Sequence, residues 1–346
     1  MSTGTLSRPG LARLSPRGPL WLAWRRQRTA LLLGGVLILA LAGYIAYQRA
    51  GMVDLIRDRN LAGCRLWYPE CHGMRLSSDD GRPTPLGRAF GELDSYRTAL
   101  LYTGRLLLAI PALIGTFIGA PLVARELESG TAKVVWSQSA GRTRWLLATL
   151  AVPAAATLAA TSLLAALFTW WWWPVRGMVF DEVSWVTTVP FEVAGPAPVA
   201  LSLLSLVLGT AFGLLLRRTV PAMACTLALT IGAMYGLRQL RPHLVPPLTT
   251  TVNLGTYAET PDDAWRLRWG YLTRSGDRLD ESTCNTLDTA RSRMRCFDRH
   301  HVVEQYADYH PMSHFWPMQW IQAGICLAAA AALAAFCVWW IRRRRA

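Results

Sequence analysis

The sequence predicts an all-α membrane protein with six transmembrane helices, an interfacial N-terminal helix and two sizeable outer segments. Three observations support this. The composition is 52% hydrophobic and only 17% charged, below the quarter that is usual in soluble domains. Six stretches of about 20 residues, the length needed to cross a bilayer core, contain no charged side chain. The formal net charge of +14 comes from short segments beside these stretches.

The first predicted span follows three arginines, as the core of a secretory signal would. It is long for such a core and five more spans follow, so we expect a retained signal anchor. The predicted spans are residues 29–47, 106–124, 145–173, 198–216, 219–237 and 320–341. None of them contains Asp, Glu, Lys, Arg or His, the residues that ion-coupled transporters use as relays within the membrane.

The segments around the spans differ in character. In the N-terminal segment 1–28, Trp21 and Trp24 would share one face of a helix, which suits a helix lying in the membrane interface. The tryptophans at 170–173 end the third span and are interpreted as interfacial anchors. The other segments are an outer segment at 48–105, a cytoplasmic loop at 125–144, an outer loop at 174–197, a cytoplasmic turn at 217–218, an outer segment at 238–319 and a tail at 342–346.

The distribution of charge predicts the orientation, because basic residues favour the cytoplasmic side of a membrane. With the N-terminus inside, the cytoplasmic segments hold sixteen basic residues and only two acidic ones, Glu126 and Glu128. We therefore expect a multi-pass protein of the bacterial plasma membrane with both termini in the cytoplasm. The basic excess lies only beside spans, so it indicates topology and contact with membrane lipid rather than binding of nucleic acid.

The two long outer segments carry mixed charge and the Gly and Pro of irregular structure, and they could fold together as a cap. They contain four cysteines, Cys64, Cys71, Cys284 and Cys296. Four cysteines allow three pairings. The simplest pairs neighbours in the sequence, Cys64 with Cys71 and Cys284 with Cys296, in an oxidising compartment.

Two histidines suggest an alternative function. His310 and His314 are four residues apart, a spacing that could place both on one metal ion if the segment is helical. With Asp308 nearby, they could form the site of an outward-facing membrane enzyme. The simpler interpretation is a pair of solvated loop histidines. No H-E-x-x-H motif occurs, and we assign neither a metal site nor a catalytic residue.

The chain lacks the phosphate-binding loop of ATPases, which requires a lysine directly after a glycine. Its only lysine is Lys133, in T-A-K-V. This chain therefore cannot be an ordinary ATPase by itself. Three G-x-x-x-G pairs lie inside spans, where small residues let helices approach closely, within one chain or between two. They are Gly115 with Gly119, Gly209 with Gly213 and Gly232 with Gly236.

The loop after the second span resembles a known family. Residues 125–131 read R-E-L-E-S-G-T, and S-Q-S-A-G-R-T-R-W follows at 137–145. This pattern is similar to the corresponding loop of type-2 ABC exporter permeases. The turn R-R-T-V-P-A-M-A at 217–224 also resembles that of actinobacterial members. The resemblance covers the membrane part, while the long outer segments depart from compact members of the family.

The resemblance implies a permease subunit that exports an amphipathic or hydrophobic substrate and has no ATPase site of its own. Its partners would be a cytoplasmic ATP-binding subunit, a second permease subunit, identical or different, and membrane lipid. The resemblance also implies that this chain has no cofactor of its own, because ATP and Mg²⁺ would be bound by the partner subunit. In the family, this loop forms the coupling helix that docks on the ATP-binding subunit. The implied coupling residues are Arg125, Glu126, Glu128, Gly130, Thr131, Ser137, Arg142 and Arg144.

The same loop can be interpreted from its residues alone. Gly130 permits a sharp turn and Thr131 can cap a new helix, so a short helix in the membrane plane is expected. Glu126 and Glu128 could pair with basic groups on the ATP-binding subunit. Besides the outward-facing enzyme, a non-transporting membrane protein for sensing or immunity remains an alternative.

Overall fold

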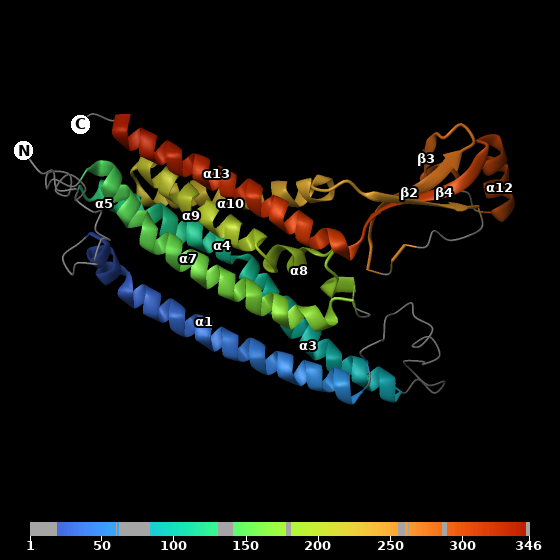
Figure 1. Cartoon of the computed structure of the whole chain (residues 1–346), viewed down its shortest axis with the longest axis horizontal. Helices are drawn as coiled ribbons and strands as arrows, with labels where there is room; N and C mark the ends of the chain where they lie inside the picture. The colour runs from blue at the N-terminus through green and yellow to red at the C-terminus, as the bar shows by residue number, and fades with distance from the viewer. Residues whose placement is uncertain are drawn as a thin grey trace, which may run out of the picture.

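The computed structural model describes residues 19–59, 61, 84–130, 141–177, 181–254, 260–261, 263–285 and 289–343. Within these ranges six helical segments are long and apolar enough to span a membrane, as the sequence predicts. They form an elongated bundle, and a small β-domain projects from one end (Figure 1). The candidate spans are Leu32–Asp58, Gly87–Glu128, Thr143–Val175, Ala197–Leu216, Thr219–His243 and Met312–Arg343.

The first two long helices extend well beyond their predicted spans. Helix α1 (Pro19–Asp58) has 40 residues, a length of about 60 Å, twice the hydrocarbon thickness of a bilayer. The boundary predicted at residue 28, between an interfacial segment and the first span, does not interrupt this helix. Helix α3 (Pro85–Leu108) begins after Thr84, whose hydroxyl accepts a hydrogen bond from the Gly87 N–H at 3.1 Å. Much of the outer segment predicted at 48–105 is thus a helical extension of two spans.

The second span contains a wide helical turn. Helix α4 (Ile110–Leu113) is followed by the π-helix η1 (Ile114–Gly119) and by α5 (Ala120–Glu128). Proline lacks the N–H that would continue the α-helical hydrogen bonds, and Pro121 is the second residue after η1. Such π-turns recur at functional positions in helices.

Four further spans complete the bundle, and one of them lies at its centre. They are α7 (Arg142–Trp172), α9 (Ala197–Leu216), α10 (Thr219–Leu240) and α13 (Phe315–Arg343). The most apolar part of α9 is 72% buried, compared with at most 39% in any other span. Short helices connect them: η2 (Trp173–Val175), η3 (Asp181–Val183), α8 (Thr188–Val193), η4 (Arg241–His243) and η5 (Met312–His314). Because α9 contacts η1, α5, α7, α10 and α13, it forms the centre of the bundle.

The segment predicted to be irregular at 238–319 contains a four-stranded antiparallel sheet. Its strands are β1 (Leu248–Asn253), β2 (Trp265–Thr273), β3 (Arg278–Asp280) and β4 (Val302–His310), in the order β1-β4-β2-β3. Leu248 of β1 lies opposite Tyr309 of β4, and Gly270 of β2 lies opposite Tyr306 of β4. The all-α prediction therefore holds for the bundle but not for this domain, because its aromatic and β-branched residues favour strands.

Two short helices cover the β-domain at its far end, α11 (Ser282–Asn285) and α12 (Ala290–Arg299). A disulfide between Cys284 and Cys296 joins them, which confirms that predicted pairing. Cys284 is buried in a small core with Tyr271 and Val302. The other two cysteines of the prediction, Cys64 and Cys71, lie outside the described residues.

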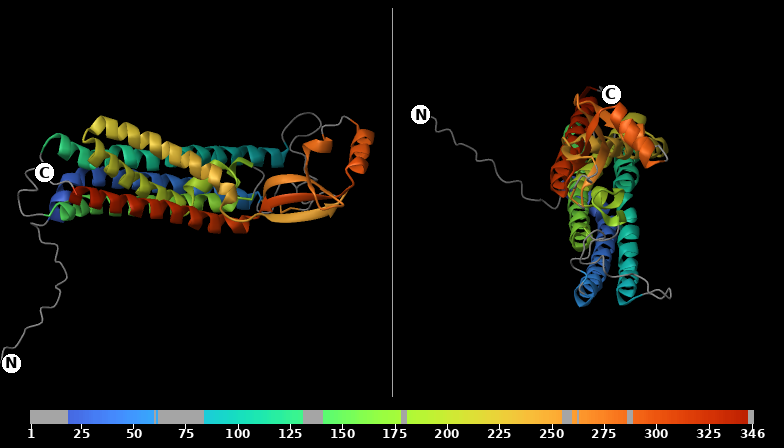
Figure 2. Two further views of the ribbon diagram at one scale, coloured as in Figure 1. Left: turned by 90° about the horizontal axis from the view of Figure 1, so that it is seen from above. Right: turned by 90° about the vertical axis from the view of Figure 1, so that its right-hand side faces the viewer.

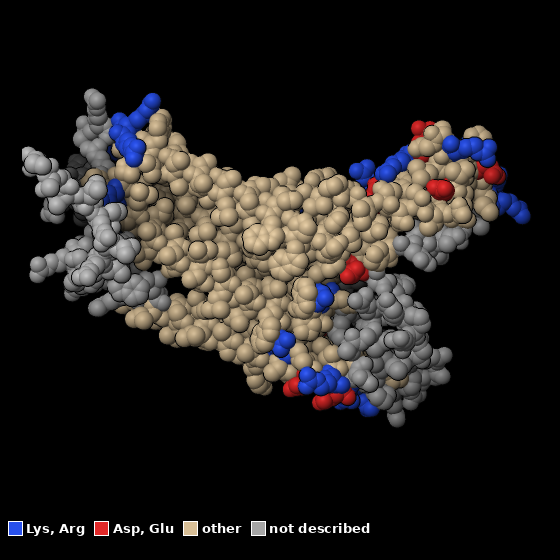
Figure 3. All heavy atoms as spheres, in the orientation of Figure 1, with Lys and Arg blue, Asp and Glu red and all other residues tan. Residues whose placement is uncertain are grey.

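The two ends of the bundle differ in charge. Between them lies a broad band without Lys, Arg, Asp or Glu on the visible face (Figure 3). We call one end the loop end: α1 begins there, α5 and α13 end there, and it carries the turn at Arg217 and Arg218 (Figures 1 and 2). We call the other the sheet end, because it carries the β-domain. Both termini of the described bundle lie at the loop end, in agreement with an even number of crossings.

Candidate functional site

At the loop end, the two turns between spans are joined by one carboxylate. Glu128, the last residue of α5, accepts two hydrogen bonds at Oε2 from Thr219, the first residue of α10. The backbone N–H of Thr219 donates at 3.0 Å and its hydroxyl at 2.7 Å. An acidic group is favourable at a helix N-terminus, where backbone N–H groups lack partners. The N-cap residue Arg218 makes no capping bond with its side chain, so α5 supplies the cap of α10.

Gly130 ends the described part of this turn in a left-handed conformation, with φ of +71°. A Cβ atom at this position would meet no atom within 4 Å. The requirement for glycine therefore comes from the backbone conformation, which side chains with a Cβ rarely adopt, and not from a lack of space. This agrees with the sharp turn expected from the sequence.

The other predicted coupling residues are distributed around this turn. Arg125 and Arg144 are exposed, and Glu126 is half-buried. Arg142 begins α7. Thr131 and Ser137 lie outside the described residues, and with them the predicted short helix of the loop. The structure thus brings the two sides of the loop to the same end of the bundle.

Both sides of the loop are held by the bundle. Val123 of α5 and Trp145 of α7 belong to one buried cluster with Leu214 of α9 and Ile341 of α13. The Arg342 Nε donates to the hydroxyl of Thr143 at 3.3 Å. The ends of this loop are therefore fixed to two neighbouring helices, α9 and α13.

Two of the three glycine pairs pack against each other within the chain. A Cβ atom on Gly209 of α9 would lie 2.3 Å from the carbonyl oxygen of Gly115, and one on Gly119 would lie 2.5 Å from that of Leu206. No side chain fits between η1 and α9 at these positions. The third pair differs, because a Cβ on Gly232 or Gly236 would meet nothing within 4 Å. The close approach therefore joins the second span, and the loop after it, to the central helix α9.

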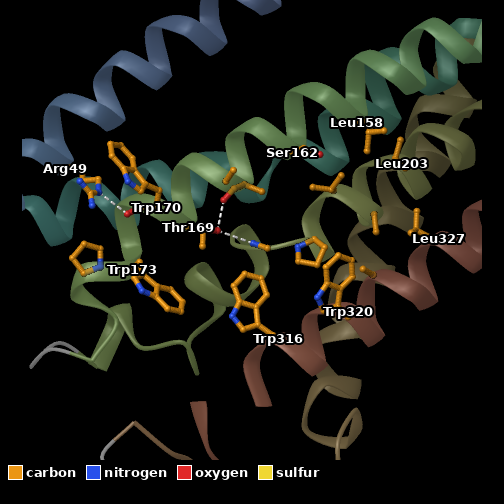
Figure 4. A pocket seen from close by; sticks show the side chains of 18 residues that line it. Arg49, Leu158, Ser162, Thr169, Trp170, Trp173, Leu203, Trp316, Trp320 and Leu327 are labelled. Carbon is orange, nitrogen blue, oxygen red and sulfur yellow. Dashed lines mark hydrogen bonds between the residues drawn. The ribbon is translucent and has the colours of Figure 1, made fainter. Parts of the chain in front are cut away.

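Near the sheet end, a groove of about 760 Å³ that was not predicted from the sequence lies between α1, α7, α9 and α13 (Figure 4). The groove is lined by Trp170 of α7, Trp173 of η2, and Trp316 and Trp320 of α13. The tryptophans at 171 and 172 are fully buried instead, so the run assigned to interfacial anchoring divides between core and groove. Tryptophans three or four residues apart on two helices were the signal that could have indicated a shared concave face.

A buried arginine joins the β-domain to the bundle. Arg241 is 5% exposed, and its guanidinium carbon lies 3.5 Å from the ring centre of Phe191 and 4.6 Å from that of Trp265. Its two terminal nitrogens donate to the carbonyl oxygens of Trp185 at 2.7 Å and Val186 at 2.9 Å. Desolvated cation–π contacts of this kind are among the stronger ones. They anchor β2, which carries Trp265, to α8 and α10.

The histidine pair takes part in the same junction. The Nδ1 atoms of His310 and His314 are 3.0 Å apart, and His310 Nε2 lies 3.1 Å from the carbonyl oxygen of Pro242. His310 is fully buried, and burial lowers its pKa, so its neutral form is favoured. Asp308 does not join this pair, because its carboxylate accepts from Arg278 at 2.9 Å and from Thr249 at 2.6 Å.

The described residues contain no group of three or more His, Cys, Asp or Glu side chains that could hold a metal ion. The pair His310 and His314 therefore offers at most two ligands there, and both side chains already contact protein atoms. The structure gives these histidines a packing role at the junction, in place of the solvated loop position expected for them.

A comparison with protein families identifies a matching family. The family model described as "ABC-2 membrane transporter related" matches residues 35–241, more than half of the chain. The matched range runs from α1 to the end of α10 and includes the Glu128–Thr219 contact and the glycine packing. It ends before the β-domain. No curated protein and no solved structure matches the chain significantly.

Proposed function

This chain belongs to the ABC-2 membrane transporter related family, and we propose that it is the permease subunit of an ATP-driven exporter. Membership supports a membrane component of a transport system. In the proposal, a separate cytoplasmic subunit binds ATP and Mg²⁺, and a second permease subunit completes the path. The substrate is amphipathic or hydrophobic, because the spans predicted from sequence offer no charged side chain to an ionic one.

The contact between Glu128 and Thr219 is the observation that carries the proposal. Force applied to the loop at 125–144 reaches α10 through the two hydrogen bonds to Glu128. It reaches α9 through the close glycine contacts of η1. One docking site can thus move three spans together, which a coupling element requires. Glu128 serves this internal contact in our proposal, rather than pairing with the ATP-binding subunit.

The surface offered to the ATP-binding subunit is basic. Arg125, Arg144, Arg217 and Arg218 are all exposed at the loop end. We therefore expect an acidic patch on the docking face of the partner, since complementary charge guides and orients such encounters. The loop end faces the cytoplasm in this proposal, and the β-domain with its Cys284–Cys296 disulfide faces the oxidising outer side.

Copurification tests the proposal most directly. A tagged chain, expressed with an untagged ATP-binding subunit of its own genome, should retain that subunit and show ATPase activity in lipid. Replacing Arg125 and Arg144 together by Glu should weaken retention, because two attractive charges become repulsive. The matched control reverses Arg57 and Arg59 at the sheet end of α1, where retention should not change. Equal retention in both double variants would exclude docking on this loop.

A further inference from the structure

The groove near the sheet end is open along its length. Trp320 is 64% exposed, and Trp170, Leu158 and Leu327 are between 46% and 49% exposed, although all four line it. Its lining residues come from four helices, and Figure 4 shows their side chains turned toward one space. A volume of about 760 Å³ is that of a small-molecule site. Because most of its lining residues belong to predicted spans, the medium at its opening is the membrane.

The groove extends over the depth of one leaflet. On α7 it runs from Trp170 to Leu158, twelve residues along one helix. At 1.5 Å per residue this is about 18 Å, compared with about 15 Å for half of the hydrocarbon core. A lipid tail that entered from the leaflet at the sheet end would therefore find contacts along its whole length.

The walls offer little hydrogen bonding to an occupant. The Thr169 hydroxyl donates to the carbonyl oxygen of Ala165 at 2.6 Å and accepts from the Gly195 N–H at 3.2 Å. Most other lining side chains are aliphatic or tryptophan. The interior therefore suits a hydrocarbon chain, which needs no polar partner.

The sheet-side end of the groove is positively charged. The guanidinium carbon of Arg49 lies 3.9 Å from the ring centre of Trp170, and its Nε donates to the carbonyl oxygen of that residue at 3.1 Å. Arg176 stacks in the same way on Trp173 at 3.6 Å. Within the described part of the chain Arg49 has no acidic partner. Its terminal nitrogens can therefore bind an anionic oxygen at the place where the groove meets the membrane surface.

We propose that this groove binds one anionic phospholipid of the sheet-side leaflet, with an acyl chain along α7 and the phosphate at Arg49. The apolar wall favours an acyl chain, the length of the groove matches one leaflet, and Arg49 favours a negatively charged headgroup. The site belongs to this chain alone and does not depend on ATP or on a partner subunit. It would fix the lateral position of α1, the helix that carries Arg49, relative to α7.

The test is native mass spectrometry of the purified chain released from nanodiscs of equal parts phosphatidylglycerol and phosphatidylcholine. The wild type should retain phosphatidylglycerol in preference. Arg49→Gln should reduce this preference roughly five-fold, the effect of one basic side chain at an anionic surface. Arg49→Lys should largely restore it, because the charge returns. Arg57→Gln, which removes an exposed arginine of the same helix outside the groove, is the matched control and should leave it unchanged.

A second variant tests the groove itself. Ala166 is exposed and lines the groove, so Ala166→Trp should fill it and lower the retention of both lipids. Ala228→Trp, at an exposed alanine on α10 outside the groove, should not. Thermal unfolding of each variant shows whether it is folded. A wild type that retains both lipids equally, a preference that Arg49→Gln leaves unchanged, or a lipid retention that Ala166→Trp leaves unchanged would overturn the proposal.

Discussion

At the scale of single residues, Glu128 makes a contact whose loss can be tested directly. Glu128→Ala removes the acceptor of two hydrogen bonds at the start of α10, and loss of a helix cap lowers the stability of the helix. We expect a modest decrease in thermal stability and a clear decrease in substrate-stimulated ATPase activity of the assembled transporter, with membrane insertion intact.

The control for this prediction is Glu128→Gln, whose side-chain carbonyl can still accept from Thr219. It should retain more stimulation than the alanine variant. Full stimulation in Glu128→Ala, measured in lipid with the ATP-binding subunit, would mean that force does not pass through this contact.

Gly130 allows a sharper comparison, because only its backbone conformation matters. With φ of +71° and open space around it, Gly130→Val should strain the turn by about 1–3 kcal/mol. Gly130→Asn should be tolerated, since asparagine adopts left-handed conformations more readily. We predict strong loss of stimulated ATPase activity for valine and near-normal activity for asparagine. Similar activity in the two variants would show that the turn does not need this conformation.

His310 predicts a pH dependence of the junction between bundle and β-domain. Burial lowers its pKa in the folded protein below the ordinary value of 6.5. Well above pH 6.5 both the folded and the unfolded states hold it neutral. As the pH falls below 6.5, the unfolded state binds a proton first, so the folded state loses stability down to the lowered pKa.

Thermal unfolding followed by tryptophan fluorescence should therefore show a lower midpoint at pH 5.5 than at pH 7.5. His310→Gln should reduce this difference, while His300→Gln, at an exposed histidine of the same domain, should leave it unchanged. A difference of equal size in wild type and His310→Gln would assign the effect to other groups.

At the scale of elements, the packing of α9 against η1 can be tested with glycines of equal sequence context. Gly209→Ala places a Cβ 2.3 Å from a backbone oxygen, and such overpacking costs about 1–3 kcal/mol. Gly232→Ala has free space and is expected to be neutral or slightly stabilising, because alanine favours helices. Unfolding midpoints in detergent should separate the two. A larger decrease of the unfolding midpoint for Gly232→Ala would indicate that this face of α10 packs against another chain.

The same elements show what sequence alone can and cannot provide. The spans were predictable because a run of about 20 residues without a charged side chain is typical of a membrane-spanning helix. The sheet was missed, although W-R-L-R-W-G-Y-L-T at 265–273 carries the aromatic and apolar residues of a strand. Its arginines and the nearby Gly and Pro suggested irregular structure instead. The π-turn at 114–119 has no comparable signal beyond Pro121, which follows it.

The candidate site was predicted in part for a similar reason. Gly130 could be recognised because a turn that ends a helix favours glycine. The contact of Glu128 with Thr219 could not, because these residues are 91 positions apart and only the packing of α5, α9 and α10 brings them together. The groove likewise forms only where four helices pack together, and the sequence alone does not show how they pack.

At the scale of the whole molecule, the orientation can be tested with the disulfide. In a variant with Cys64 and Cys71 replaced by Ser, mild reduction should open the Cys284–Cys296 bond. A membrane-impermeant thiol reagent should then label the protein in intact spheroplasts. The remaining cysteines, Cys225, Cys326 and Cys337, lie within spans. Labelling that requires broken membranes would place the β-domain in the cytoplasm.

Helix α10 also connects the loop end of the molecule rigidly to the β-domain. Its first residue is held by Glu128, and the chain directly after its last residue carries Arg241, whose guanidinium is enclosed by rings of the bundle and the β-domain. The helix has 22 residues, a length of about 33 Å. A tilt of about ten degrees around its loop end would displace Arg241 by roughly 6 Å. Its guanidinium carbon lies only 3.5 Å from the ring centre of Phe191 and 4.6 Å from that of Trp265. A tilt of that size must therefore either carry the β-domain with the helix or pull the arginine out of its aromatic enclosure.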